Sequence, residues 1–479
     1  MAISSFTPAG KDYTQKVIGA GNYLDIQDNG WAQQYLPDLL EKEAEVFGKR
    51  TISGFLSQVS AEEAMSADQV IWSEQGRLHL AYECTIVSAA ASTMKVAKTM
   101  DGVAQTTDHG IRVGDMVLIA GGGQTITARV SVAGDTDDDI TVTPYGYAHL
   151  SDAGFADGDD TNKVLVFGSE FGKGTNNQTR SNEPVFQTYT NKPIIIKDMY
   201  EVSGSDAAQV GWVEISGEDG QNGYYWYLKA SGDTKARFND YLEMVCIEAE
   251  KNVAASNINT GSGAASADDS HGTEGLFKAI TSRGHQSSGI TGVNAATDLA
   301  EFDAMLAAFD ENGAIEENMM FVNRGTSLAI DDMLASMNSY GAGGTSYGVF
   351  DNSEDMALNL GFSGFRRGSY DFYKSDWKYL NDKQTRGGIN AAATGGEAIR
   401  GAVIPAGVSN VYDQQLGKNL KRPFLHVRYR ASNLESRKNK SWVTGSVGAV
   451  TSDLDAMTMN FLSERCMVVQ GANNFCLLN

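Results

Sequence analysis

The sequence of 479 residues predicts a mixed α+β protein that carries a small β-rich insertion. Short apolar runs between residues 85 and 168 are separated by turn signals, which is typical of a small β-barrel or sandwich. A continuous apolar stripe at helical spacing runs from about residue 234 to 254. Beyond residue 291, amphipathic helical patterns alternate with short buried strands. Together these patterns indicate several folded parts in one chain, rather than one uniform domain.

The first 77 residues are expected to form an irregular arm. Short helices are predicted at 37–47 and 61–70, and turn-rich stretches without a core-forming period surround the first of them. A segment this fragmented cannot bury much apolar surface by itself. We therefore expect it to depend on neighbouring parts of the molecule or on other copies of the chain.

The β-rich stretch is expected to be an inserted, solvent-facing module. Between residues 101 and 162 the chain has eleven acidic residues against two basic ones. Asp135, Asp137, Asp138 and Asp139 suggest a solvated hairpin tip rather than a calcium loop, because no glutamate stands at the EF-hand spacing. The glycine runs at 121–123 and 341–344 are interpreted as turns. The strands are predicted at 85–96, 116–119, 128–132, 140–144 and 164–167.

The chain then returns through predicted strands at 184–190 and 193–196 and a short helix at 197–210. The helix predicted at 234–254 places Phe238, Leu242 and Val245 on one face. Asp233 or Thr234 is expected to cap its start, and Gly232 to interrupt any earlier helical turn. At 257–270 the chain is rich in glycine, alanine, serine and asparagine, which predicts a flexible loop.

The remaining chain is expected to be mixed. A helix is predicted around residues 299–309, and a buried strand at 319–323 precedes a helix capped by Thr326. Further strands are expected at 370–373 and 424–429. The runs at 466–470 and 475–478 are interpreted as a hairpin that closes a sheet.

Composition and motifs argue against catalysis and against nucleic-acid reading. The formal net charge is −22, and the compact basic group Arg437, Lys438 and Lys440 is too small for a phosphate-binding stripe, so a surface or inter-subunit patch is expected there. The chain lacks the motifs of a nucleophile elbow, a P-loop or a zinc protease. We therefore expect no enzyme activity, no catalytic residues, no cofactor and no metal. An enzyme with a site scattered along the sequence would escape this search.

Single residues and targeting signals support the same expectation. The six histidines have no metal-ligand spacing: His79, His109, His149, His271, His285 and His426. The cysteines Cys84, Cys246, Cys466 and Cys476 are scattered and are expected to be reduced and buried. We find no run of 18 apolar residues and no secretory pattern at residues 1–10, so neither membrane insertion nor export is expected.

The order of these parts resembles the Hong Kong 97-type fold of tailed-phage major capsid proteins. In that resemblance, residues 1–77 are the N-terminal arm and 78–191 are the E-loop, with an insertion domain at about 85–168. Residues 192–290 correspond to the P-domain with its spine helix at about 234–254, and 291–423 to the A-domain. Residues 424–479 return to the A- and P-domain sheets, and 463–475 are similar to the closing P-domain strands. The resemblance rests on this order and on no short motif.

The resemblance implies a structural function. The chain would assemble with itself into hexamers and pentamers of an icosahedral shell around double-stranded DNA, without sequence-specific DNA contacts and without a membrane. Portal, scaffolding and decoration proteins would be its other partners, and it would assemble in the bacterial cytoplasm and reside in the virion capsid. Two alternatives stay open: an encapsulin-like nanocompartment shell protein, and a non-catalytic surface or adhesin protein.

Overall fold

The chain folds into two compact units, and each is described by itself. The first comprises Met1–Trp72 with Thr190–Asn479, and the second is the inserted unit Ser73–Tyr189. The helix predicted at 37–47, the loops at 257–270 and 341–344, and Asp135, Asp137 and Asp138 lie outside the described residues. The computed structural model describes residues 52, 54–76, 78–100, 102, 109–134, 139–160, 162–178, 180–182, 186–205, 225–252, 272–312, 315–337, 364–392, 398–406, 408–413, 418–446 and 450–479.

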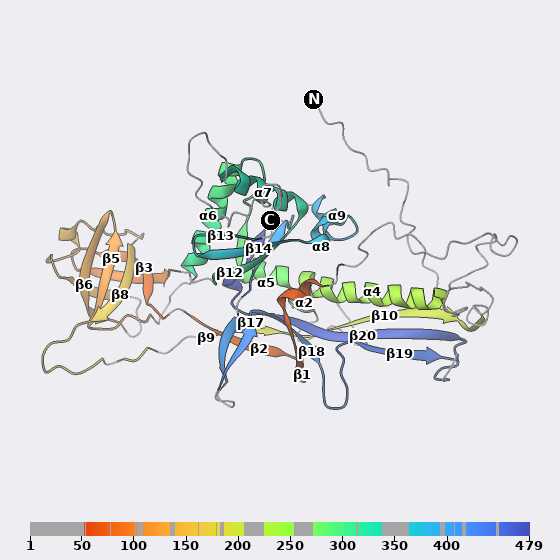
Figure 1. The fold of residues 1–479 in the computed structure, drawn as a ribbon. Helices are drawn as coiled ribbons and strands as arrows, with labels where there is room; N and C mark the ends of the chain where they lie inside the picture. The colour runs from red at the N-terminus through yellow and green to blue at the C-terminus, as the bar shows by residue number, and fades with distance from the viewer. Residues whose placement is uncertain are drawn as a thin grey trace, which may run out of the picture. The chain divides into compact units, whose positions relative to one another are not determined.

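The inserted unit is a closed six-stranded barrel (Figure 1), as the sequence predicts. Side chains alternate between its interior and its exterior along each strand, which is the pattern of a sheet with one buried face. Around the barrel the strands are β3 (Ala81–Ser88), β4 (Thr93–Thr99), β7 (Asp139–Pro144), β6 (Gln124–Ala133), β5 (Asp115–Gly121) and β8 (Asn162–Ser169).

Two turns show how local chemistry shapes the barrel. Gly122 and Gly123 have φ values of 57° and 78° and join β5 to β6, because such a tight hairpin turn needs left-handed backbone at both positions. The single strand predicted at 85–96 is instead two strands, β3 and β4. The break falls before Ser92, whose φ of 56° and backbone bond to Ala89 reverse the chain.

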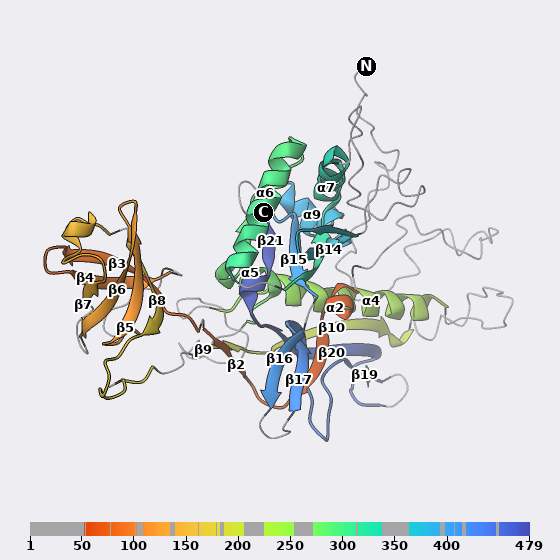
Figure 2. The same cartoon turned by 60° about the vertical axis from the view of Figure 1, so that its left-hand side comes forward.

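A five-stranded sheet with one long helix forms the first layered part of the larger unit (Figure 2). Helix α4 (Tyr225–Glu248) packs on two of the strands. Phe238 and Leu242 of the helix meet Phe461 of the sheet in a small buried cluster. The strands are β1 (Ala61–Met65), β18 (Leu425–Arg430), β20 (Ala456–Val469) and β10 (Ile194–Ser203) in that order, with β19 (Lys440–Gly445) also paired to β20.

Several local predictions in this part are wrong. Residues 61–70 are not helical, because β1 pairs in parallel with β18 and a second strand, β2 (Val70–Gln75), begins at Val70. Residues 197–203 are not helical either, because β10 continues along β20 to Ser203. Helix α4 begins at Tyr225 and passes through Gly232 without a break, so Asp233 and Thr234 lie inside it and do not cap it. A glycine inside a helix costs only about 1 kcal/mol, which tertiary packing can offset.

A six-stranded mixed sheet forms the second layered part. Phe302 and Phe309 of helix α6 (Ala295–Glu311) and Ile330 of helix α7 (Arg324–Met337) share one core with alternate strand residues, including Met320. Both helices were expected from the sequence, although Asn323 rather than Thr326 accepts the capping bond of α7. The strands in order are β11 (His285–Ser287), β21 (Cys476–Leu478), β15 (Gly401–Pro405), β12 (Glu317–Val322), β14 (Tyr370–Asp376) and β13 (Gly364–Arg367).

The other face of this sheet joins the two layered parts in one core. Phe321 and Leu477 on that face pack in the same cluster as Leu425 and Met467 of the five-stranded sheet. Helix α5 (Leu276–Arg283) and helix α2 (Phe55–Val59) contribute to it.

The smaller elements are η1 (Ser151–Ala153), β9 (Phe186–Asn191), α8 (Lys378–Asn381), α9 (Arg386–Asn390), β16 (Val408–Asp413), β17 (Lys418–Pro423) and η4 (Ala472–Asn474).

The predicted C-terminal hairpin is wrong. β20 belongs to the five-stranded sheet and β21 to the six-stranded sheet, so the chain crosses from one to the other between them. Gly471, at a φ of 59°, turns the chain into η4 for this crossing. The C-terminal strands therefore tie the two layered parts together.

Candidate functional site

A buried polar network lies in the larger unit, where the chain returns from the insertion. The chain passes into the insertion through β2 and returns through β9, and these two strands pair with each other. Asn191, the last residue of β9, is only 1% exposed. The strand ends here because Pro193 has no backbone N–H to donate to a ladder, and β10 starts at Ile194.

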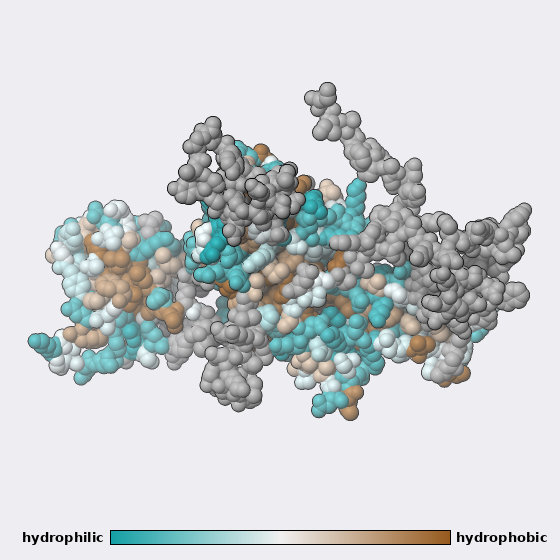
Figure 3. Space-filling model, viewed as in Figure 1, coloured by the Kyte–Doolittle hydropathy of each residue, from teal (hydrophilic) through white to brown (hydrophobic). Residues whose placement is uncertain are grey.

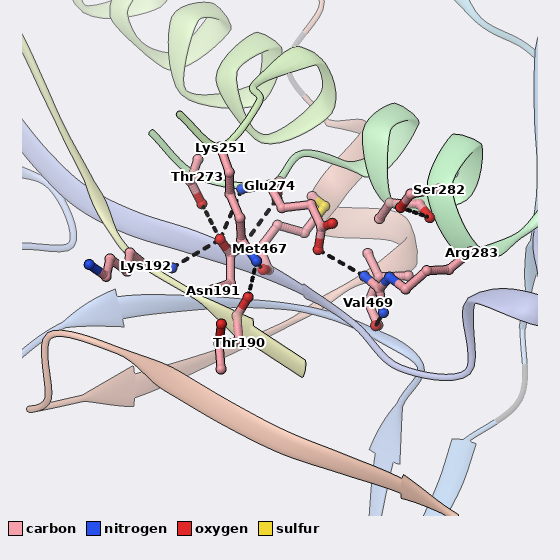
Figure 4. A network of polar contacts seen from close by, with 11 residues as sticks. Thr190, Asn191, Lys192, Lys251, Thr273, Glu274, Ser282, Arg283, Met467 and Val469 are labelled. Atoms are coloured by element: carbon pink, nitrogen blue, oxygen red, sulfur yellow. Dashed lines mark hydrogen bonds and ion pairs between the residues drawn. The ribbon is translucent and has the colours of Figure 1, made fainter. Parts of the chain in front are cut away.

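The side chain of Asn191 both donates and accepts hydrogen bonds (Figure 4). Its amide nitrogen donates to the carbonyl oxygens of Met467, at 2.6 Å, and Glu274, at 3.1 Å. Its oxygen accepts from the backbone nitrogens of Lys192 and Glu274, both at 2.9 Å, and from the hydroxyl of Thr273 at 3.2 Å. One buried amide thus links the returning strand to β20 and to the segment before α5.

Charged side chains surround this amide. Lys251, just beyond α4, donates to the carbonyl oxygen of Thr190. Arg283 of α5 pairs with Glu274 at 2.8 Å, with both side chains mostly buried, and its guanidinium lies 5.7 Å from the ring centroid of Trp72 on β2. Trp72 therefore contacts α5, and Thr190 contacts the segment that follows α4. No sequence pattern predicts this network of contacts around Asn191.

A second anchor holds the chain where the N-terminal segment meets α4. The backbone nitrogen of Ile52 donates to Asp240 at 3.0 Å, and that of Gly54 donates to Glu243 at 2.5 Å. Burial raises the pKa of Glu243, while the backbone donors of Gly54 and its neighbours partly offset that rise. Phe55 then stacks on Trp377, with ring centroids 4.3 Å apart. These contacts hold Ile52 and Gly54 against α4 and bury Phe55.

The five-stranded sheet carries exposed apolar side chains on the face opposite α4. Met199 of β10, Asn460 of β20 and Trp442 of β19 form one row by strand register, and Ile195 stands on the same face of β10. Ile195 and Met199 are 51% and 55% exposed. Met199 and Trp442 are therefore exposed apolar side chains on one face, separated by the polar Asn460.

The four cysteines, which were expected to be reduced and buried, are confirmed as buried. Cys84, Cys246, Cys466 and Cys476 are free and buried, and burial raises the pKa of each thiol to about 12. Thiolates at neutral pH are therefore negligible, and these cysteines cannot serve as nucleophiles. Among the described residues, no group of three or more histidine, cysteine or acidic side chains could hold a metal ion.

The histidines stand in different parts of the fold. His109 is in the inserted unit near Tyr82, with ring centroids 6.5 Å apart. His285 of β11 lies 3.0 Å from the Asn312 amide, and burial lowers its pKa. His426 is buried on β18, and His79 and His149 belong to the inserted unit. His271 lies outside the described residues.

The basic group near residue 438 is paired within the chain. Arg437 meets Glu464 of β20 at 2.7 Å, and Lys438 pairs with Glu62 of β1. Lys440 meets Glu435 at 2.6 Å. Neighbouring acids thus offset these charges, so the group offers little net positive charge to a phosphate backbone. No described helix is both long and apolar enough to cross a membrane.

No protein-family model and no curated protein matches the sequence. Among solved structures, the chain is similar to the capsid structure of the cyanophage P-SCSP1u, at 9% identity and a TM-score of 0.41, covering 99% of this chain and 98% of the other. It is also similar to the asymmetric unit of the bacteriophage PhiM1 mature capsid, at 7% identity and 0.40, covering 93% and 91%. A structure from Mycobacterium phage Ogopogo aligns at 10% identity and 0.39, covering 94% and 98%. All three TM-scores are below 0.5, so function is inferred from the chain's own contacts.

Proposed function

We propose that this chain is the major capsid subunit of a tailed phage, and that it assembles with itself into the icosahedral shell around a double-stranded DNA genome. The observation that carries the proposal is the long layer of α4 on β10 and β20. One face of this layer is closed by the helix, and the other presents the exposed apolar side chains of Ile195, Met199 and Trp442 among polar ones. Exposed apolar side chains of this kind suit lateral contact with another subunit.

The lengths of α4 and β20 suggest that this layer is stabilised by contacts with other copies of the chain. Helix α4 has 24 residues, or about 36 Å at 1.5 Å per residue, and β20 has 14 residues, or about 46 Å at 3.3 Å per residue. The buried apolar cluster between them is small, with Phe238, Leu242 and Phe461 at its centre. Other residues of α4 and β20, such as Cys246 and Met467, belong to the larger core, so contacts between copies would add burial mainly around Phe238.

The junction at Asn191 fits the same function. A shell subunit that reaches over its neighbours needs its excursion held at the base, and the pairing of β2 with β9 and the bonds of Asn191 supply this. Within the proposal, residues 1–77 act as the N-terminal arm, 78–191 as the E-loop with its insertion, 192–290 as the P-domain, 291–423 as the A-domain, and 424–479 as the return to both sheets.

The net negative charge of the chain suits a shell wall that does not bind the DNA inside it. At a net charge of −22 the protein repels a phosphate backbone, and Arg437, Lys438 and Lys440 are paired within the chain. Packaged DNA would therefore be enclosed without sequence-specific contacts. Portal, scaffolding and decoration proteins complete the proposed partners, with assembly in the bacterial cytoplasm before the subunit resides in the virion.

Electron microscopy of the purified chain tests the proposal. We expect closed shells or hexamer- and pentamer-sized rings, and we expect Met199→Glu to reduce assembly strongly while Met199→Leu assembles normally. Both variants should melt as the unaltered subunit does, because Met199 is 55% exposed. A wild-type chain that stays monomeric in light scattering at high concentration contradicts the proposal.

The contents and location of the particles separate the two alternatives. Shells from phage-producing cells should contain DNA, whereas an encapsulin-like nanocompartment would contain a cargo enzyme. A surface or adhesin protein would be found outside the producing cell without forming particles. Mass spectrometry of purified virions should recover peptides of this chain in many copies per particle.

A further inference from the structure

The exterior of the inserted barrel has one apolar face. Met116 and Leu118 of β5 and Leu165 and Phe167 of β8 point outward, and strand register sets Leu118 opposite Leu165. We call these four residues the β5–β8 face. Figure 3 shows hydrophobic residues gathered on the barrel, which lies at the left of that view. A barrel surrounded only by water would carry polar side chains at such positions.

Outward positions on other strands of the barrel carry polar side chains. Glu83 of β3 and Lys98 of β4 point outward and pair at 2.9 Å. On β6, Thr125 and Thr127 stand opposite Ala120 and Leu118. The β5–β8 face is therefore bordered by polar side chains, while other exposed apolar residues of the barrel, such as Val87 and Val132, lie outside it.

Opposite charges stand at the two ends of this face. Lys163 precedes Leu165 by two residues in the outward row of β8, and Glu170 directly follows the strand at its other end. Seven residues of strand separate them, or about 23 Å at 3.3 Å per residue. The carboxylate of Glu170 also accepts a hydrogen bond from the phenol of Tyr145.

This charge arrangement is self-complementary. Consider a second copy related by a two-fold axis that lies between two such faces and crosses β8 at a right angle between residues 166 and 167. Leu165 and Phe167 of the two copies would then pack together around the axis. Lys163 of each copy would meet Glu170 of the other, once at each end of the contact. Sheets packed face to face lie about 10 Å apart, which the outward side chains can fill.

We propose that the β5–β8 face of the inserted barrel docks onto the same face of a second copy of this chain. The proposal deepens the capsid function and rests on it for the supply of many closely spaced copies. The contact is isologous, so each barrel contributes both the apolar centre and the two end charges. It gives the acidic insertion a function in linking subunits.

Cysteine cross-linking in the assembled full-length protein tests the contact. With a short bismaleimide, Phe167→Cys should give covalent dimers on a denaturing gel. Val87→Cys is the matched control, because Val87 and Phe167 are each 50% exposed on the same barrel but Val87 lies outside the β5–β8 face. The four natural cysteines are buried and should contribute no background.

Charge exchange tests the two-fold geometry. In the Phe167→Cys background, Lys163→Glu or Glu170→Lys should each lower the dimer fraction roughly tenfold, because symmetry repeats each lost pair and each new repulsion. The double variant K163E/E170K should restore the dimer. A double variant that stays as low as the single variants overturns the proposed geometry.

The outcomes distinguish this contact from the capsid function. Intact particles whose Phe167→Cys variant gives no dimer would refute the contact and leave the shell function standing. Cross-linking of Phe167→Cys to a polypeptide of different mass would show that another protein occupies the face, which also refutes it. Dimers without any particles would support the contact and refute the shell function. Absence of both dimers and particles refutes both.

Discussion

Replacing Asn191 with alanine should loosen the larger unit at the base of the insertion. The change removes two donated and three accepted hydrogen bonds from a side chain that is 1% exposed. It leaves the carbonyl oxygens of Met467 and Glu274 without this donor. The backbone nitrogens of Lys192 and Glu274 lose their acceptor at the same time.

The magnitude follows from the number of bonds. A typical intramolecular hydrogen bond contributes about 0.5–1.5 kcal/mol net, so five bonds amount to roughly 2.5–7.5 kcal/mol. Water entering the space left by the side chain recovers part of this, and single substitutions above about 4–5 kcal/mol are exceptional. We therefore expect a loss of about 3–5 kcal/mol in the larger unit.

Hydrogen exchange measured by mass spectrometry is the suitable assay, because a chain of two units does not unfold in one step. Peptides from β10 and β20 should exchange about a hundred- to a thousandfold faster in Asn191→Ala, since each 1.4 kcal/mol is a factor of ten. Peptides from β5 and β8 should be unchanged. Asn182→Ala is the control, because that exposed amide donates a hydrogen bond of 2.9 Å to the carbonyl oxygen of Gly110. Unchanged exchange in β10 and β20 would refute the reasoning.

Three further predictions concern other buried contacts. Phe55→Ala should cost the larger unit about 3–5 kcal/mol, because it empties the space beside Trp377, and differential scanning calorimetry should show the lowered transition. Lys374→Met should cost about 3–5 kcal/mol in chemical denaturation, because Asp331, paired at 2.5 Å, stays buried and charged. Glu243→Gln should gain stability relative to wild type as pH rises above about 4.5, because burial raises the folded-state pKa and ionisation opposes folding.

Each of these has its own control. Ile71→Ala removes an exposed side chain and should change the transition little. The double variant Lys374→Met with Asp331→Leu should recover most of the loss, and a double variant as unstable as Lys374→Met would contradict the ion-pair explanation. For Glu243→Gln, the stability difference from wild type should vanish well below pH 4.5, where the carboxyl is protonated in both states. A difference independent of pH would show that ionisation is not its cause.

The barrel and the amphipathic helices could be predicted from the sequence. The strand alternation, the Gly122–Gly123 turn and the stripe through Phe238 and Leu242 are all set within a few residues. Because the same short windows of chain form the same local structures in the fold, α+β class and the inserted barrel are confirmed by the structure. The domain boundaries within the larger unit stay a prediction.

The features that the sequence did not predict depend on contacts between residues far apart in the chain. Residues 61–65 have a helical pattern but become β1, because they pair with 426–430, far away in the sequence. The runs ending at Val469 and beginning at Cys476 look like a hairpin but join different sheets. Asn191 gives no sequence signal, because its partners, Glu274 and Met467, lie 83 and 276 residues away.

The sequence by itself determined local features. These are the positions of the barrel strands and of the long helix, and the preference of the four cysteines for the interior. Only the tertiary structure decided which strands pair, where the chain crosses between sheets, and that one asparagine holds the base of the insertion. The physical reason is that periodicity and turn chemistry depend on adjacent residues. Pairing and buried hydrogen bonds depend on partners that folding alone brings together.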